Sequence, residues 1–297
     1  MRARRARPNL TRPAPGPRTF PPGRGVGRPM DLFDDPAPHP AASGPAAPDP
    51  DAPDDGLAAL REKALAVHAA LCRAYECPIP YFSDKDPLSE LVSALLSHRT
   101  KNADSGRAYT RLRERFPTWE GARDAPVEDV QEAISPCTWP EQKAPRVQAV
   151  LREITAAPET DGLSLDALAE WPADRARRWL QAFKGVGPKT SAAVLLFSRL
   201  RVAALPVDSH HHRVAQRLGL IPGSMAVGPS HDALAALMPE GWDAQAVYDH
   251  HEVLMLHGQK CCFYRRPACG RCPVYDLCVW GGKGPTDGRG NKGRSNK

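Results

Sequence analysis

Four cysteines stand close together near the C-terminus, at Cys262, Cys269, Cys272 and Cys278, in a chain of 297 residues that has eight cysteines. Their spacing is CX6CX2CX5C. Clustered thiols can pair as disulfides, hold a structural zinc ion or bind an iron–sulfur cluster. Structural zinc usually joins two knuckles across a longer insert, whereas these four lie in one loop. The cysteines alone indicate a metal loop and leave zinc and iron–sulfur open.

A second group of residues with chemical potential lies at 180–200, in LQAFKGVGPKTSAAVLLFSRL. Gly185 and Gly187 permit a tight turn and close approach of the backbone to a ligand. The amides of this turn, and of the helix expected from Pro188 onward, could bind a phosphate, although glycine turns between helices are common. Lys189 falls in the first turn of that helix, where the helix dipole opposes its charge. A neutral lysine amine is a nucleophile for Schiff-base chemistry.

Asp208 follows nineteen residues later, in PVDSHHHRV. It precedes an expected helix, so a plain N-cap explains it. It could also face Lys189, take its proton and stabilise a positively charged transition state. Neighbouring residues on a helix point about 100° apart, so His210, His211 and His212 cannot chelate one metal ion together.

Composition and charge limit the cellular location of the protein and the way in which it could bind nucleic acid. No apolar run approaches the length of a membrane span, and the basic N-terminus has no apolar segment behind it, so we expect a cytoplasmic protein that does not bind membranes. The net charge is +6, but residues 1–56 contribute about +1 and residues 281–297 about +4. The central part is therefore nearly neutral. If it binds nucleic acid, it does so through a local basic surface.

The elements that must position these groups are helices. Residues 1–56 hold fourteen of the 32 prolines, and we expect them, like the basic tail 281–297, to be disordered. Between the tails, apolar residues recur at three- and four-residue spacing, and no alternating pattern indicates a sheet. Asp86 and Pro87 form a favoured helix start. We expect an all-α fold of about ten helices.

The motifs together resemble the endonuclease III family of helix–hairpin–helix DNA glycosylases with an iron–sulfur loop. KGVGPKT, VDSHHHRV and the cysteine spacing occur in the family's order, and LLSHRTKN and HHEVLMLHGQKCC resemble two further family segments. The resemblance runs from about residue 80 to residue 278. It implies a [4Fe–4S] cluster on the four cysteines, and Cys261 falls outside the family spacing. Cys72, Cys77 and Cys137 show no partner pattern and are expected as small buried residues.

The resemblance also implies a mechanism and a substrate. Lys189 would attack C1′ of a damaged nucleotide flipped out of double-stranded DNA, and Asp208 would activate the lysine. The enzyme would remove oxidised pyrimidines and cut the resulting apurinic or apyrimidinic (AP) site by β-elimination. Two alternatives stay open: a paralogue that cleaves AP sites but excises bases weakly, and a non-catalytic module that binds damaged DNA. We expect a monomer in each case.

DNA contacts follow from the same resemblance. Arg99 aligns with the family's glutamine wedge, Asn102 replaces its usual aspartate, and Lys184 stands where proline is common. Trp139 falls at the second intercalating position, where it could stack on the orphaned base pair or simply pack as an aromatic.

The remaining expected contacts are the hairpin glycines Gly185 and Gly187, His210 lining the active site, and Arg265 and Arg266 on the cysteine loop. The two arginines could bind phosphates or form a solvated face.

The family architecture implies two helical domains beside a DNA cleft. Residues 57–80 and 203–280 would form the iron–sulfur cluster domain. Residues 81–202 would form a six-helix barrel that carries the helix–hairpin–helix at about 180–200. Lys189 would then come from the barrel and Asp208 from the cluster domain.

Overall fold

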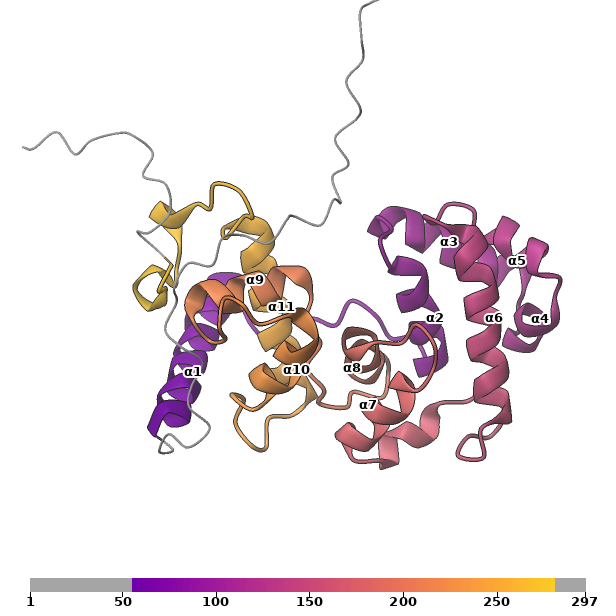
Figure 1. The fold of residues 1–297 in the computed structure, drawn as a ribbon, viewed down its shortest axis with the longest axis horizontal. Helices are drawn as coiled ribbons and strands as arrows, with labels where there is room; N and C mark the ends of the chain where they lie inside the picture. The colour runs from indigo at the N-terminus through magenta and orange to yellow at the C-terminus, as the bar shows by residue number, and fades with distance from the viewer. Residues whose placement is uncertain (1–54, 281–297) are drawn as a thin grey trace, which may run out of the picture. The chain divides into compact units, whose positions relative to one another are not determined.

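The computed structural model describes residues 55–280, so almost all of the two expected disordered tails, 1–56 and 281–297, lies outside the described residues. Residues 55–280 contain eleven α-helices, three short 3-10 helices and no strand (Figure 1). The all-α prediction is confirmed. The α-helices are α1 (Asp55–Tyr75), α2 (Pro87–Ser97), α3 (Asn102–Arg115), α4 (Trp119–Asp124), α5 (Val127–Ala133), α6 (Pro140–Ala156), α7 (Ala173–Gln181), α8 (Pro188–Phe197), α9 (Ser209–Leu218), α10 (Val227–Ala235) and α11 (Ala244–Lys260). None of them is long and apolar enough to cross a bilayer.

The helix boundaries follow local sequence signals closely. Asp86 caps α2 as predicted, since its side chain accepts a hydrogen bond from the Ser89 amide at 2.8 Å and Pro87 occupies the first turn. Residues 166–170 form a 3-10 helix, and α4 has only six residues, too few to show a helical period in the sequence.

Two hydrophobic cores form within the described residues. The first is built mainly from α2 to α8 and includes Leu91, Leu96 and Leu151, all fully buried. The second is built from α1, α9, α10 and α11, with the end of α8 and the cysteine loop packed against it. In Figure 1, α9 and α11 lie side by side within this second core. The predicted domain boundaries at residues 81 and 203 stay a prediction.

Helix α8 contributes to both cores. Every residue from Thr190 to Phe197 is buried, with Val194 and Leu195 in the first core and Leu196 and Phe197 in the second. A helix that is apolar on all sides is a central helix. The first turn of α8, which holds Lys189, is therefore fixed by packing from two directions.

A disulfide between Cys72 and Cys77 corrects the expectation that these cysteines are unpaired. The sulfur atoms are 2.12 Å apart and the Cα atoms 4.9 Å apart. The chain leaves α1 through Glu76, whose φ is 64°, and the Cys77 amide donates to the Cys72 carbonyl at 3.1 Å. This is a Schellman helix end, which brings the third residue before the cap next to the second residue after it. The separation of five residues between the two cysteines does not by itself predict a disulfide.

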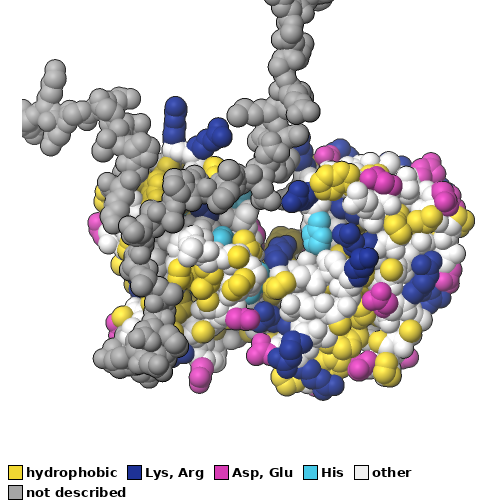
Figure 2. Space-filling view, viewed as in Figure 1, with side chains coloured by type: hydrophobic (Ala, Val, Ile, Leu, Met, Phe, Trp, Pro, Cys, Tyr) yellow, Lys and Arg dark blue, Asp and Glu magenta, His cyan; other side chains and the backbone are white. Residues whose placement is uncertain are grey.

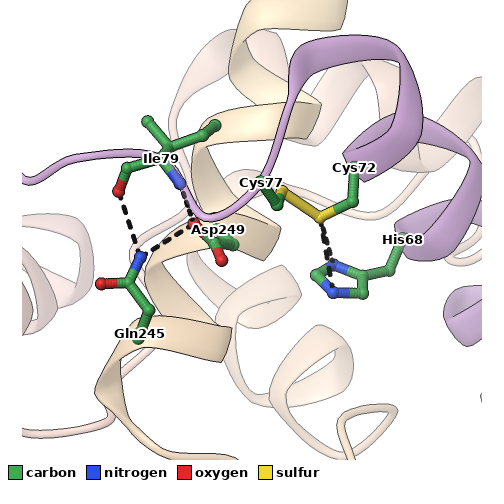
Figure 3. Close-up of a disulfide and its surroundings, with 6 residues drawn as sticks. All are labelled: His68, Cys72, Cys77, Ile79, Gln245 and Asp249. Atoms are coloured by element: carbon green, nitrogen blue, oxygen red, sulfur yellow. Dashed lines mark hydrogen bonds between the residues drawn. A yellow bond between two sulfur atoms is a disulfide. The ribbon is translucent and has the colours of Figure 1, made fainter.

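The disulfide fixes the exit of the chain from α1 onto α11. The Ile79 amide donates to the Asp249 carboxylate at 2.8 Å, and the Gln245 side chain donates to the Ile79 carbonyl and to Asp249 (Figure 3). The His68 side chain lies beside the disulfide, with its Nε2 atom 3.7 Å from the Cys72 sulfur.

A group of buried histidines occupies the second core. His211 is fully buried, and its ring lies 5.6 Å from that of His250 and 5.7 Å from that of His251. Neither ring nitrogen of His211 has a hydrogen-bond partner among the described residues. Burial lowers the pKa of His250 to about 3 and that of His251 to about 4. Burial raises the pKa of nearby Glu252 to about 7.

These shifts predict acid sensitivity. Below pH 6.5 the unfolded chain protonates histidines that the folded chain keeps neutral, so stability is full above that pH and is lost as pH falls toward the folded values. Glu252 opposes this between about pH 4.5 and 7, since the folded chain holds its proton. The histidines outnumber it, and we expect a net loss of stability on acidification.

The variant His250→Gln isolates one of these protons. Urea unfolding at several pH values from 5 to 7 should show that the free energy of unfolding changes less steeply than in the wild type, by up to about 1.4 kcal/mol per pH unit. Identical slopes for the two proteins would show that His250 is not kept neutral by the fold.

Candidate active site and DNA-binding surface

Lys189 lies in the first turn of α8, as predicted, and is half-buried. Burial lowers the pKa of its ammonium, while the charges of Asp208 and then Glu90 oppose that shift. Glu90 is a buried residue of α2 whose carboxylate accepts from the Ser83 hydroxyl at 3.1 Å. The fold therefore holds Lys189 in a poorly hydrated position, which favours its neutral, nucleophilic form, while the two carboxylates within electrostatic reach favour the charged form.

Asp208 is the N-cap of α9. One oxygen of its carboxylate accepts from the His211 amide at 2.7 Å. The segment leading to it is held on both sides, because the Val207 amide donates to His231 at 3.1 Å and His251 bonds the Pro206 carbonyl at 2.8 Å. Both predicted roles of Asp208 are thus compatible: it caps a helix, and its charge acts on Lys189.

The hairpin between α7 and α8 lines one open pocket together with His98 and the start of α10. Lys184, Gly185, Gly187 and Lys189 all contribute to it. On the face shown in Figure 2, Lys, Arg and His side chains gather around a hollow. Among the expected hairpin contacts, Lys184 and Gly185 are exposed and Gly187 is half-buried. The pocket brings residues from helices of both hydrophobic cores to one surface.

A second open pocket adjoins the first through His98. It is lined by His98, Arg99, Trp139, Gln142, Lys143 and Arg146. Arg99 is exposed and Trp139 is 45% exposed. Both have left-handed backbones, with φ of 49° and 54°. Such conformations are uncommon for residues other than glycine and often mark functional positions.

Arg146, which lines the second pocket, was not singled out from the sequence. Gly185 has φ of 92°, and a Cβ atom placed there would lie 2.7 Å from the Cδ atom of Arg146. The arginine side chain therefore lies directly against the hairpin backbone and requires glycine at that position. No ion pair involves Arg146 within residues 55–280. Its partner is thirty-nine residues away in the chain, so local sequence carries no signal for this contact.

The four predicted metal ligands come together. Cys262, Cys269, Cys272 and Cys278 line one small cavity with apolar neighbours, and Cys261 lines it as well. The cysteine loop is bound to α9 by Arg217, which donates to the Phe263 carbonyl at 2.7 Å and to the Cys262 sulfur at 3.3 Å. Four thiols around an apolar cavity fit a soft, iron-containing group.

Comparisons with known proteins agree with this geometry. Residues 92–242 match the family model of the HhH-GPD superfamily of base excision DNA repair proteins, and residues 265–278 match the iron–sulfur binding domain of endonuclease III. The first match spans half of the chain. The chain belongs to the HhH-GPD superfamily.

Curated relatives within this superfamily cover most of the described residues. Endonuclease III of Escherichia coli strain K12 is 29% identical over 203 residues, which cover 68% of this chain and 88% of that protein. An Arabidopsis thaliana protein, provisionally named as a DNA glycosylase, is 28% identical over 194 residues, and the match spans 64% of its length. A solved structure of a trapped endonuclease III–DNA covalent intermediate has a TM-score of 0.63 at 22% identity, covering 75% of this chain and 97% of that one.

The cysteine loop of this HhH-GPD member is an iron–sulfur binding domain of the endonuclease III type. Next to the predicted ligand Cys272 lie His257, whose Nε2 is 3.6 Å from the Cys272 sulfur, and Cys261. His257 packs against the loop, and its Nδ1 atom lies at hydrogen-bond distance, 3.1 Å, from the Tyr75 hydroxyl. When bound, the cluster would hold the loop in shape on α9.

The remaining predicted DNA contacts lie at different depths. Arg265 and Arg266 are exposed on the cysteine loop, and Arg266 has φ of 53°. His210 is half-buried at the start of α9 and accepts from Arg213 at 3.2 Å. Its Cβ lies so close to Gly258 of α11 that a side chain there would clash. The roles of these three residues stay predictions.

Proposed function

We propose that this HhH-GPD protein is a bifunctional DNA glycosylase and AP lyase that removes oxidised pyrimidines from double-stranded DNA. What supports the proposal is the placement of Lys189 in the first turn of the central helix α8, within electrostatic reach of Asp208, the N-cap of α9. A lysine whose pKa is lowered by burial in such a position is suited to nucleophilic catalysis.

In the proposed reaction the neutral Lys189 amine attacks C1′ of the flipped nucleotide. The C1′–N bond breaks, the base leaves with a proton, and opening of the sugar gives an imine between Lys189 and C1′. Loss of a C2′ proton then breaks the bond from C3′ to its phosphate oxygen, which nicks the strand. Asp208 accepts the lysine proton and stabilises positive charge on the sugar.

The DNA would lie across the two adjoining pockets. The amides at Gly185 and Gly187 and the Lys184 ammonium would bind phosphates near the flipped nucleotide. The exposed side chains of Arg99 and Trp139 would fill the space that the nucleotide leaves. The cysteine loop, with its [4Fe–4S] cluster, would add phosphate contacts through Arg265 and Arg266.

Borohydride trapping tests the proposal. The wild-type protein is incubated with one duplex carrying an AP site and another carrying thymine glycol, and the imine is reduced to a stable adduct. Adducts on both duplexes are expected. An adduct on the AP site alone would favour the lyase with weak base excision and point to Arg99 and Asn102, which depart from the family pattern. Binding without any adduct would favour the non-catalytic module.

Arg146 should contribute one phosphate contact. The variant Arg146→Gln is expected to weaken binding to a duplex with an AP-site analogue and to lower the slope of log K against log salt by about 1. Arg152→Gln is the matched control, since Arg152 lies exposed on the same helix and donates to the Arg123 carbonyl at 3.0 Å. Equal slopes for the two variants would remove Arg146 from the interface.

A further inference from the structure

The two loops that carry Arg99 and Trp139 are joined by one hydroxyl group. The loop after α2 holds Arg99, and the loop before α6 holds Trp139. Thr100 lies beside Arg99, and its Oγ1 atom accepts a hydrogen bond from the Thr138 amide at 3.2 Å. Thr138 is the residue before Trp139. The two exposed side chains are therefore each one residue from the same hydrogen bond.

Lys143 completes this connection from within α6. It is a buried lysine, 5% exposed, and its ammonium donates to the Leu96 carbonyl, the His98 carbonyl and the Thr100 hydroxyl, each at 2.7 Å. An ammonium has three protons, so all of its donors are used on this loop. Lys143 has none left for a phosphate, in contrast to Arg146 one turn later.

The same loop is also bound to α8, the helix that carries Lys189. The His98 Nε2 atom and the Thr190 hydroxyl lie 3.0 Å apart, and Thr190 follows Lys189 directly. Burial, together with the charges of Lys189, Lys143 and Arg146, lowers the pKa of His98 to about 4. The ring is thus neutral near pH 7, and the contact to Thr190 is an ordinary hydrogen bond.

We infer that Thr100 and Lys143 are positioning residues that lock the Arg99 and Trp139 loops into one rigid unit, so that both side chains enter DNA together and in register with Lys189. The inference rests on the proposed function, because it assigns the two side chains to the space of the flipped nucleotide. Left-handed backbones at both Arg99 and Trp139 persist only where surrounding contacts hold them, and the Thr100–Lys143 network supplies those contacts.

The lock matters most for a base that is still paired. Extruding a nucleotide costs unpairing and unstacking energy, which the inserted side chains must offset, whereas an AP site has no base to extrude. A misplacement of about 1 Å in a positioning group can cost about 10²-fold in rate. Loosening the lock should therefore slow base excision much more than cleavage of a preformed AP site.

The test compares Thr100→Val with Thr100→Ser. Valine has the shape of threonine but removes the hydroxyl, while serine keeps it. Thr138 is exposed, so water can bind its freed amide, whereas the buried Lys143 ammonium loses one of its three acceptors. Thermal unfolding of both variants checks that the fold survives. We expect Thr100→Val to slow excision of thymine glycol roughly 10- to 100-fold and AP-site cleavage no more than about threefold, with Thr100→Ser close to the wild type.

A fluorescence readout separates the lock from the chemistry. A duplex carrying a tetrahydrofuran AP analogue opposite 2-aminopurine brightens when the inserted side chains unstack the opposite base. Thr100→Val should brighten it less than the wild type, and Thr100→Ser should match the wild type. This signal needs no catalysis, so it tests the lock even if the wild type forms no adduct and the proposed function fails. A Thr100→Val protein that matches the wild type in fluorescence and in excision would overturn the inference.

A double-mutant cycle tests whether the two side chains act as one. In the wild-type background, the losses from Arg99→Ala and Trp139→Ala should be coupled, so that the double variant loses less than the product of the two single effects. In the Thr100→Val background the coupling should disappear. Independent effects in both backgrounds would also overturn the inference.

Discussion

Replacing Lys189 by alanine is expected to abolish the covalent adduct with DNA and to slow cleavage of an AP site by about 10³-fold or more, because the variant has no amine to attack C1′. The fold should tolerate the change. Burial already disfavours the charged ammonium, so its removal relieves a desolvation cost in the folded chain. Borohydride trapping and strand cleavage, with thermal unfolding alongside, measure both parts of the expectation.

Lys184→Ala is the matched control for this experiment. Lys184 lies five residues earlier on the exposed hairpin and lines the same pocket. The Lys184→Ala variant should bind DNA less tightly but still form the adduct at saturating protein concentration. An adduct that survives in Lys189→Ala and is lost in Lys184→Ala would move the nucleophile to the hairpin and would contradict the proposed mechanism.

The second large effect is expected for Asp208→Asn, which removes a charge and keeps a cap. Asparagine accepts the hydrogen bond from the His211 amide as aspartate does, and the two residues are nearly equal as N-caps. Stability should change by less than about 0.5 kcal/mol. Base excision should fall by about 10²- to 10⁴-fold, the usual range for a lost general base or charge-stabilising group.

The pH dependence identifies the cause of that loss. The Asp208 charge raises the pKa of Lys189, so its removal lowers that pKa further and leaves the lysine neutral at lower pH. The residual AP-lyase activity of Asp208→Asn should therefore rise with pH at a lower midpoint than in the wild type. Asp243→Asn is the control, since Asp243 caps α11 through the Ala246 amide at 2.8 Å and is not among the charges that act on Lys189. Equal losses of base excision in the two variants would show that Asp208 acts only as a helix cap.

Sequence patterns predicted the features that depend on neighbours along the chain. The start of α2 at Asp86 and Pro87, the start of α8 at Pro188 and the cap at Asp208 each follow from a few adjacent residue types. The cysteine loop is equally local, because its four ligands lie within seventeen residues. The residues left Asp208 open as a plain N-cap or as a partner of Lys189, and only the family resemblance favoured the second role.

Contacts between distant segments were not predictable from one sequence. The packing of Arg146 on Gly185 joins residues thirty-nine apart, and the bonds from Lys143 to the Arg99 loop span more than forty. A buried lysine with three backbone and hydroxyl acceptors looks like any charged helix residue in the sequence. Cys72 and Cys77 are close in sequence, but their disulfide depends on a left-handed backbone at Glu76, a position where glycine would be the usual sequence signal.

Helix α9 connects the cysteine loop to Asp208. Asp208 caps one end of this ten-residue helix. In its last turn the Arg217 side chain donates to the Phe263 carbonyl of the loop, and the Arg217 carbonyl accepts from Cys278 and from the Trp280 amide. A short helix moves as one body, so whatever shapes the loop also orients the carboxylate. With the function proposed above, loss of iron from the loop would weaken base excision through the orientation of Asp208, although the cluster takes no part in the reaction itself.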